Sequence, residues 1–129
     1  TMMTLWCIFR SPFMVGAELT KLDDWTLKLL TNKKVLRLIS RSAGARQVMR
    51  DKNQAVWLSR DTEKDVLYLA LFNLSDNERM VGISSCEIGL DTFMGHTLEE
   101  LWTGEIMQGK EDTFKTAIPP HGARLYAIQ

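Results

Sequence analysis

Cysteine, proline and net charge are all scarce in this sequence. Its 129 residues include two cysteines, three prolines, and sixteen basic residues that are balanced by sixteen acidic ones. A formal net charge of zero excludes a global electrostatic attraction to nucleic acid or to anionic lipid. The hydrophobic share of 45% and the charged share of 25% are ordinary for a soluble globular protein. The length allows one modest domain, or one domain with a piece of another.

The scarcity of cysteine also limits the chemistry. Cys7 and Cys86 are too far apart for a disulfide framework and have no metal-ligand spacing. Neither His96 nor His121 lies at ligand spacing from a cysteine, so we expect no metal and no cofactor. Cys7 and Cys86 are interpreted as two free thiols in apolar surroundings. Unpaired cysteines favour a cytoplasmic location without fixing it.

No hydrophobic run is long enough to cross a membrane. The apolar stretch from Met2 to Val15 is interrupted by Arg10 and Pro12, and a helical span needs roughly 20 apolar residues. The stretch also lacks the basic region and the small-residue cleavage site of a secretory signal. We therefore expect no membrane partner, and interpret the stretch as a buried piece of a larger fold.

The first part of the chain has helical periodicity, with one exception. Residues 2–10 predict a helix that is apolar nearly all round, and Pro12 ends it. The run "PFMVG" (12–16) is apolar without alternation, which is typical of a strand buried on both faces of a parallel sheet. Residues 23–40 predict a helix with Asp23 as N-cap, broken in two at Asn32.

Helix, buried strand and helix in this order indicate the end of a β/α repeat. A parallel strand needs hydrogen-bonding neighbours on both edges, and no other strand in the sequence can pair with this one in a β/α manner. The sequence is therefore expected to be a piece of a longer protein whose true N-terminus it does not contain.

From about Arg46 onward the pattern changes to short strands separated by turn residues. The predicted strands are "QAVWLSRD" (54–61), "VLYLALFNL" (66–74), "RMVGIS" (79–84), "LEELWTG" (98–104), "FKTAI" (114–118) and "ARLYAIQ" (123–129). Strands of this kind with no helices between them predict an antiparallel sandwich. We therefore divide the chain into an α/β part at 1–45 and an all-β sandwich at 46–129.

One cluster of basic side chains has two interpretations. It contains Lys33, Lys34, Arg37, Arg41, Arg46, Arg50 and Lys52, with Asp51 as its only acidic neighbour. A nucleic-acid site would favour such a cluster with interleaved aromatic residues, which are absent here. A solvated linker is the preferred interpretation, so no nucleic-acid partner is expected.

Other candidate groups carry no recognisable catalytic pattern. Asp23-Asp24 and Glu99-Glu100 are adjacent in sequence, so the two carboxylates of each pair point to different faces. His121 lies between a proline pair and a glycine and is interpreted as part of a turn. Glu18 follows the end of the predicted parallel strand, where functional groups of α/β proteins gather, and is the one candidate for a substrate-proximal residue. A solvated loop acid is the alternative.

Several segments together resemble the C-terminal third of the α-galactosidase and α-N-acetylgalactosaminidase family, glycoside hydrolase family 27. They are "LWCIFRSPFMVGAEL", "TLKLLTNKKVL", "VWLSRD", "ALFNLSD", "LEELWTGE" and "PPHGARLYAI", and the likeness covers essentially the whole chain. The resemblance implies the last helix, strand and helix of a (β/α)₈ barrel, followed by an antiparallel β-sandwich.

The resemblance also implies a function for the whole protein. The family uses a retaining mechanism, which needs two carboxyl groups about 5 Å apart. In the family both lie on earlier barrel strands, so this chain is expected to hold no catalytic residue, and the α-galactoside substrate would bind the missing barrel. Ala17-Glu18 and Ser40-Arg41-Ser42-Ala43-Gly44 depart from the common family pattern, which indicates a divergent, bacterial branch.

Two hypotheses follow from the sequence. In the first, the chain is the C-terminal piece of a retaining α-galactosidase-like glycosidase, inactive alone, with Trp57, Phe72 and Trp102 stabilising the contact with the barrel. In the second, the chain is a non-catalytic sandwich that binds sugar or protein. Exposed coplanar tryptophans on one face would favour the second. The sequence leaves open the preference for galactose or N-acetylgalactosamine, the oligomeric state and export.

Overall fold

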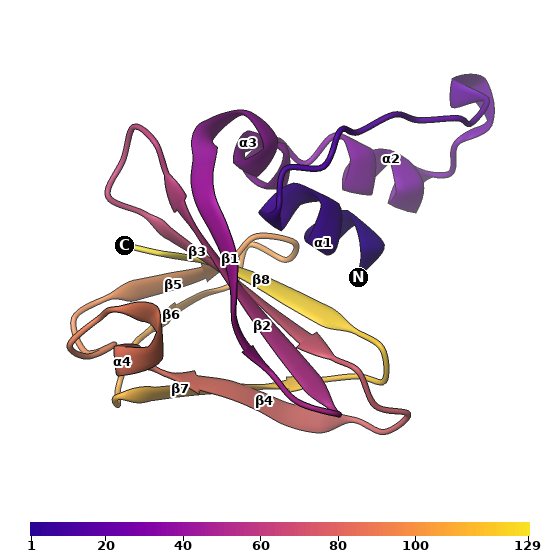
Figure 1. Cartoon of the computed structure of the whole chain (residues 1–129). Coiled ribbons are helices and arrows are strands. Elements are labelled where there is room, and N and C mark those ends of the chain that lie inside the picture. The colour runs from indigo at the N-terminus through magenta and orange to yellow at the C-terminus, as the bar shows by residue number, and fades with distance from the viewer.

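The structure is a computed structural model that describes all 129 residues. Its helical N-terminal part, residues 1–41, lies against one side of a β-sandwich and is called the lead segment below (Figure 1). The segment contains α1 (Met2–Ile8), the short 3-10 helix η1 (Leu19–Lys21), α2 (Asp24–Leu30) and α3 (Lys33–Arg41). None of its helices is long and apolar enough to cross a membrane.

Side-chain caps begin two helices of the lead segment, α2 and α3. The Asp23 carboxylate accepts a hydrogen bond from the Thr26 backbone N–H (2.6 Å) and begins α2. The Asn32 side-chain oxygen accepts from the backbone N–H groups of Lys34 (3.1 Å) and Val35 (3.2 Å) and begins α3. The predicted break at Asn32 is therefore confirmed, and it arises because a new N-cap starts there.

The rest of the chain is a sandwich of two antiparallel sheets. Its elements are β1 (Ser42–Arg50), β2 (Gln54–Asp61), β3 (Leu67–Asn73), β4 (Arg79–Ser84), the short helix α4 (Ser85–Ile88), β5 (Thr97–Glu100), β6 (Ile106–Gln108), β7 (Thr113–Ile118) and β8 (Ala123–Ile128). The large sheet has the order β1-β2-β3-β8-β5-β6, and the small one pairs β4 with β7. The predicted fold class is confirmed.

The central strand β3 is buried on both faces. Leu67, Leu69 and Leu71 point into the core between the two sheets. Tyr68, Ala70 and Phe72 point to the opposite face, where they form a second core with α1 and α3. This position explains why "VLYLALFNL" is a continuous apolar run instead of an alternating one.

The sequence predicts six of the eight strands and misses β1 and β6, the two edge strands of the large sheet. β2 and β4 have the predicted bounds, whereas β1, β6 and α4 were not predicted. The predicted strand 98–104 ends early, because Leu101–Gly104 turn toward β6. β1 begins at Ser42, before the expected change at Arg46, and contains a bulge at Gly44 whose φ is +66°. A bulged edge strand loses the regular alternation by which strands are recognised.

The predicted strand 12–16 is not a β-strand in this structure. Residues 11–17 have no regular secondary structure apart from a bend, and the backbone of 12–17 makes no hydrogen bond within the chain. Neither sheet contains a strand that pairs with this segment, so its backbone groups have no partner in a sheet. The prediction of a buried strand at 12–16 is therefore wrong for this chain, where most of the segment is exposed.

Candidate docking surface

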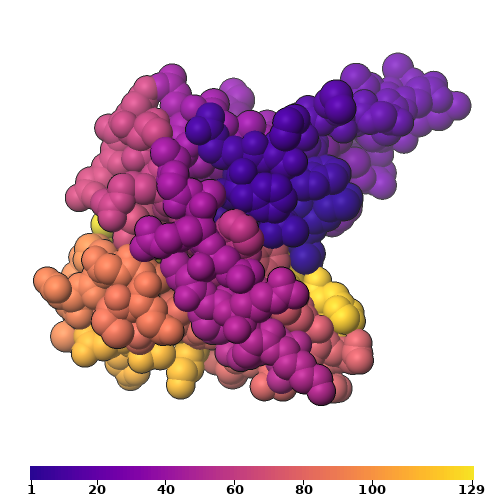
Figure 2. All heavy atoms as spheres, in the orientation of Figure 1, coloured from indigo at the N-terminus to yellow at the C-terminus, as the bar shows by residue number.

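An apolar groove lies between the lead segment and the adjoining part of the large sheet, where Trp102, Ala123 and Arg124 also line it. The groove has a volume of about 680 Å³ and lies between α1, the irregular segment after it, and α2. In Figure 2 only the middle of the lead segment, around η1, projects from the body of the molecule as an arm at the upper right. We call the groove the docking surface, and define it by Met2, Trp6, Phe13, Met14, Trp25 and Leu29.

Two of the apolar residues that define the docking surface, Met14 and Trp25, are largely exposed to solvent. The Met14 side chain is 86% exposed and that of Trp25 is 71% exposed. Trp6 and Phe13 pack edge to face, with 5.9 Å between their ring centroids. Contiguous apolar area of this kind typically marks a site of protein association.

Two of the polar side chains that line the groove, Glu100 and Asn32, are hydrogen-bonded within the chain. Glu100 is 1% exposed, and its carboxylate accepts from the backbone N–H groups of Trp102, Thr103 and Leu125 and from the Thr103 hydroxyl, at 2.7–3.3 Å. The Asn32 amide donates to the Leu101 carbonyl (2.8 Å). Most of the other residues that line the groove are hydrophobic, which suits it to an apolar protein surface.

The opposite side of the lead segment is packed firmly against the large sheet. Cys7, Ile8, Val35 and Leu38 are fully buried there. The three aromatic residues that the sequence assigned to this contact all lie in it: Phe72 belongs to the buried cluster, and Trp57 and Trp102 pack at its margin. Trp57 lies 5.8 Å from Phe9 between ring centroids, and the Trp102 indole N–H donates to the Thr4 hydroxyl (3.0 Å).

A buried carboxylate connects α3 to the β2–β3 hairpin. Asp61 has a fully buried side chain. It accepts from the Arg37 Nε–H (3.0 Å) and the Tyr68 hydroxyl (2.7 Å). It also accepts from the backbone N–H groups of Glu63 (2.9 Å) and Lys64 (3.1 Å). The network explains why α3 keeps a fixed position on the sandwich.

The hydrogen bonds to Asp61 determine its protonation state. Burial by itself raises the pKa of the Asp61 carboxyl, but the bonds from Arg37, Tyr68 and the Lys64 backbone outweigh it, so that the net pKa is lowered. Burial and the bond to Asp61 raise the pKa of Tyr68 to about 12. The carboxyl is therefore the charged member of the network, and the phenol is the neutral donor.

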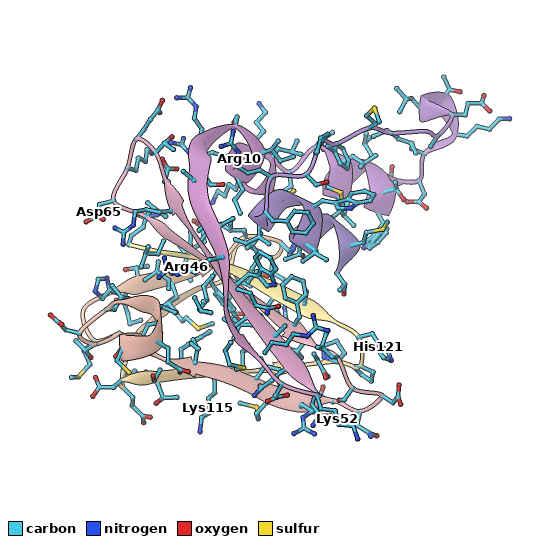
Figure 3. The ribbon with its side chains drawn as sticks, in the orientation of Figure 1. Arg10, Arg46, Lys52, Asp65, Lys115 and His121 are labelled. Carbon is cyan, nitrogen blue, oxygen red and sulfur yellow. The ribbon has the colours of Figure 1, made fainter.

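Three of the seven residues of the basic cluster form ion pairs with residues of the sandwich, and the cluster is not a linker. Lys34 pairs with Glu99, Arg37 with Asp61, and Arg41 with Glu63. Arg46 and Arg50 lie on β1, and Lys52 lies in the β1–β2 turn (Figure 3). The linker interpretation was wrong because acidic partners distant in sequence neutralise the helix, and the basic residues that follow it belong to an edge strand.

Glu18 lies far out on the arm, immediately before η1. Its carboxylate forms an ion pair with the Lys21 ammonium (3.0 Å) and accepts from the Thr20 hydroxyl (3.0 Å). Both side chains of the ion pair are exposed. The structure brings no second carboxylate into contact with Glu18.

The two histidines occupy turns or loops and do not come together at a metal site. His121 has a φ of +51° in the turn before β8, as the sequence predicts, and its Nε2 lies 2.9 Å from the Asp76 carboxylate. His96 lies 3.3 Å from the Gln129 carbonyl through Nδ1. No group of three or more His, Cys, Asp or Glu side chains could hold a metal ion.

The two cysteines are free, and they have different surroundings. Cys7 is fully buried in the core under α1, as expected, and burial raises its pKa to about 11. Cys86 is exposed, with its sulfur 3.0 Å from the Ser84 hydroxyl, so the predicted apolar setting is wrong for this residue. The short helix α4, which the sequence did not predict, carries it to the surface.

We expect the two thiols to react at very different rates. At pH 8 a maleimide should label Cys86 in the folded protein, while Cys7 is protected by burial and by its low thiolate fraction. Mass spectrometry should show one label on the native protein and two after unfolding in denaturant. Cys86→Ser should abolish the native labelling. Equal labelling of Cys7 in the folded state would contradict the packing of α1.

The residues that join the lead segment to the sandwich were largely missed from sequence. The run "RDTEKD" signals that a turn follows Asp61, since Asp favours turns by bonding nearby backbone N–H groups. It gives no indication that Arg37 and Tyr68 reach the same carboxylate. The burial of Glu100 could not be predicted either, because charged residues are rarely buried.

Comparisons with known proteins agree with this architecture. Residues 51–128 match the family described as the α-galactosidase C-terminal β-sandwich domain. Among curated proteins, α-galactosidase D of Emericella nidulans is 27% identical over 99% of the chain, and α-galactosidase 2 of Arabidopsis thaliana is 22% identical over 97%. The chain spans 20% and 32% of the length of these two relatives.

Solved structures superpose on the lead segment as well as on the sandwich. A family 27 β-L-arabinopyranosidase from Geobacillus stearothermophilus is 38% identical, with a TM-score of 0.92 over 99% of this chain and 29% of that one. A protein described as a putative α-N-acetylgalactosaminidase from Bacillus halodurans is 30% identical, with a TM-score of 0.91 over the same shares. The chain belongs to the α-galactosidase C-terminal β-sandwich family and corresponds to the C-terminal part of a family 27 glycoside hydrolase.

Proposed function

We propose that the chain is the structural C-terminal part of a retaining glycosidase of the α-galactosidase type, and that it is inactive alone. The observation that carries this proposal is the two-sided lead segment. One side is fixed to the sandwich by a shared core and by the Asp61 network, and the other presents an unpaired backbone and exposed apolar side chains. Such a segment is suited to complete a second domain.

We propose the division of the chain that follows from this role. Residues 1–45 would be the end of a (β/α)₈ barrel, with 12–16 as its last strand, and residues 46–129 the sandwich. The irregular backbone of 12–16 would become a strand when neighbouring barrel strands supply hydrogen-bond partners on both edges.

The carboxylates of the chain support the assignment of catalysis to the rest of the parent protein. Retaining glycosidases need two carboxyl groups about 5 Å apart, facing the sugar from opposite sides. Asp61 and Glu100 are buried, and hydrogen bonds satisfy them. Glu18 is paired with Lys21 and is proposed only as a residue near the substrate, at the mouth of the barrel.

The substrate is proposed to be an α-galactoside, and a β-L-arabinopyranoside is a second candidate. Curated relatives of the chain are α-galactosidases, whereas the solved relative at 38% identity is a β-L-arabinopyranosidase. The two sugar rings differ in the hydroxymethyl group, which the arabinopyranoside lacks. The two solved relatives at 30% and 38% identity are bacterial, which supports a bacterial parent.

The proposal predicts that activity requires the parent protein. On nitrophenyl α-galactoside and nitrophenyl β-L-arabinopyranoside, the purified 129-residue chain should release no nitrophenol above background, and its full-length parent should hydrolyse one of the two. Hydrolysis by the chain itself, abolished by Glu18→Gln, would disprove the assignment of catalysis to the rest of the parent.

The structure gives little support to the alternative of a sugar-binding sandwich. The aromatic contacts contain no stacked pair of tryptophans. Trp57 packs against Phe9 of the lead segment, and the Trp102 indole N–H donates to the Thr4 hydroxyl. Trp25 is exposed, but it lies on α2 and not on the sandwich.

A further inference from the structure

Arg46 belongs to the basic cluster but forms no ion pair with an acidic side chain of the chain. It lies on β1 directly opposite Leu58 of β2, and Arg60 follows two residues after Leu58. Residues two apart on a strand share a face of the sheet, and diagonal neighbours on paired strands lie about 7–8 Å apart. Arg46 and Arg60 therefore extend from the same face of the large sheet, within reach of one common ligand.

The two arginines line a cavity of about 270 Å³ that shares no residue with the docking surface. Leu58 and Leu67 also line it, and both are almost fully buried, so they give the cavity an apolar floor. Gly44 lies at the bulge of β1, where the position of a Cβ would meet no atom within 4 Å, so this wall is open. An apolar floor lowers the local dielectric and strengthens the attraction between a guanidinium group and an anion.

No carboxylate of the chain satisfies the two guanidinium groups. The Asp65 Oδ1 is 3.8 Å from the Arg60 Nη1, which is beyond hydrogen-bond distance, and the Asp65 side chain is fully exposed. Asp61 lines the cavity as well, but its carboxylate already accepts from Arg37, Tyr68 and two backbone N–H groups. Like charges close together on paired strands repel each other, and a bound anion would relieve the repulsion.

We propose that Arg46 and Arg60 bind a small oxyanion with two negative charges, such as a phosphate group. A guanidinium group presents parallel N–H donors that fit two oxygens of a phosphate or carboxylate group. A phosphate group carries a charge of about −1.5 to −2 at neutral pH, which balances two guanidinium groups. A small dicarboxylate is the other source of the same chemistry. The site goes beyond the proposed function, because it requires neither a sugar nor the barrel.

An anion titration followed by nuclear magnetic resonance tests the proposal on the 129-residue chain itself. Inorganic phosphate is added at pH 7.5, with potassium chloride keeping the ionic strength constant, and succinate is titrated in a second series. Backbone amide signals of Gly44, Arg46 and Arg60 should shift in a saturable manner. Tighter binding of succinate than of phosphate would identify a dicarboxylate as the ligand of the same site. Shifts that do not saturate with either anion would overturn the proposal.

Three matched variants locate the anion. Arg46→Gln and Arg60→Gln should each weaken phosphate binding roughly tenfold or more, because each removes charged hydrogen bonds to the anion. Both side chains are exposed, so the variants should still fold. Arg50→Gln removes the same charge from the same strand, but Arg50 lies opposite Ala55 and does not line the cavity. Its dissociation constant should stay within about twofold of the natural value. Equal weakening by all three variants would overturn the site, because it would show a general effect of net charge.

Thermal unfolding supplies a second readout that does not depend on assigning individual signals. A ligand that binds only the folded state raises Tm as its concentration rises above the dissociation constant. Phosphate should therefore raise the Tm of the natural chain and leave that of the double variant Arg46→Gln/Arg60→Gln unchanged. The same rise in both proteins would mean that phosphate acts by exclusion from the protein surface, and the proposed site would be wrong. Binding is measured without any enzyme assay, so its failure leaves the proposed function untouched.

Discussion

Asp61→Ala should lower the free energy of unfolding by about 3 kcal/mol. The substitution removes a fully buried carboxylate and leaves the Tyr68 hydroxyl and the Arg37 guanidinium without their acceptor. Two backbone N–H groups of the β2–β3 turn also lose their partner. We expect the low end of the range for broken buried pairs, because the Arg37 side chain is 33% exposed and water can replace part of the interaction. Urea denaturation monitored by circular dichroism measures the loss.

Asp65→Ala is the matched control for this prediction. Asp65 lies at the tip of the same hairpin, points away from the molecule (Figure 3), and is 3.8 Å from the Arg60 guanidinium. Its side chain is fully exposed, so its removal should change the free energy of unfolding by less than about 0.5 kcal/mol. Equal losses for the two variants would contradict the structural role of the Asp61 network.

The same carboxylate makes stability depend on pH. The folded-state pKa of Asp61 is lowered, so its contribution to stability is fully present above the unfolded value of about 3.9. The contribution is lost as the pH falls through the lower, folded-state pKa. The difference in unfolding free energy between the natural protein and Asp61→Asn should therefore shrink with acidification below about pH 4. A difference that is constant from pH 7 to pH 3 would contradict the lowered pKa.

Local patterns in the sequence were sufficient to predict the centre of the fold. The turn residues that flank 54–61 and 79–84 give the bounds of β2 and β4. β4 also has one buried face and one exposed or half-buried face, whereas both faces of β2 are largely buried. The break at Asn32 was predicted because an N-cap is a local feature. Periodicity does not predict edge strands such as β1 and β6, because a bulge interrupts one and only three residues form the other.

The candidate surface was only partly predictable, for a related reason. The sequence assigned Trp57, Phe72 and Trp102 to a contact with the barrel; in the structure they pack in or beside the core under α1 and α3. Hydrogen bonds join residues that are far apart in sequence, such as Arg37 to Asp61 and Asn32 to the Leu101 carbonyl. No local pattern encodes such a pair. The apolar run 12–16 was predicted to be a buried strand, whereas in this chain it is irregular and makes no backbone hydrogen bond.

Phe72→Ala should destabilise the protein by about 3–5 kcal/mol and weaken the attachment of the lead segment in particular. Phe72 is 4% exposed and belongs to the core that β3 shares with α1 and α3. The cavity left by the ring would lie under the helices, because neighbouring side chains of a strand point to opposite faces. In native-state hydrogen exchange, amides of α1 and α3 should lose protection before those of β4 and β7.

Leu71→Ala, one residue away on the same strand, supplies the comparison. Leu71 is fully buried in the core between the two sheets, so its truncation should cost about 2–5 kcal/mol. Its cavity lies on the face toward the small sheet, and amides of β4 and β7 should lose protection first. If the two variants instead produced the same exchange pattern, the two cores would unfold as one cooperative unit. The lead segment would then be as much a part of the sandwich as β4 and β7, and the hydrophobic contact under α1 and α3 would not be a separable junction between two domains.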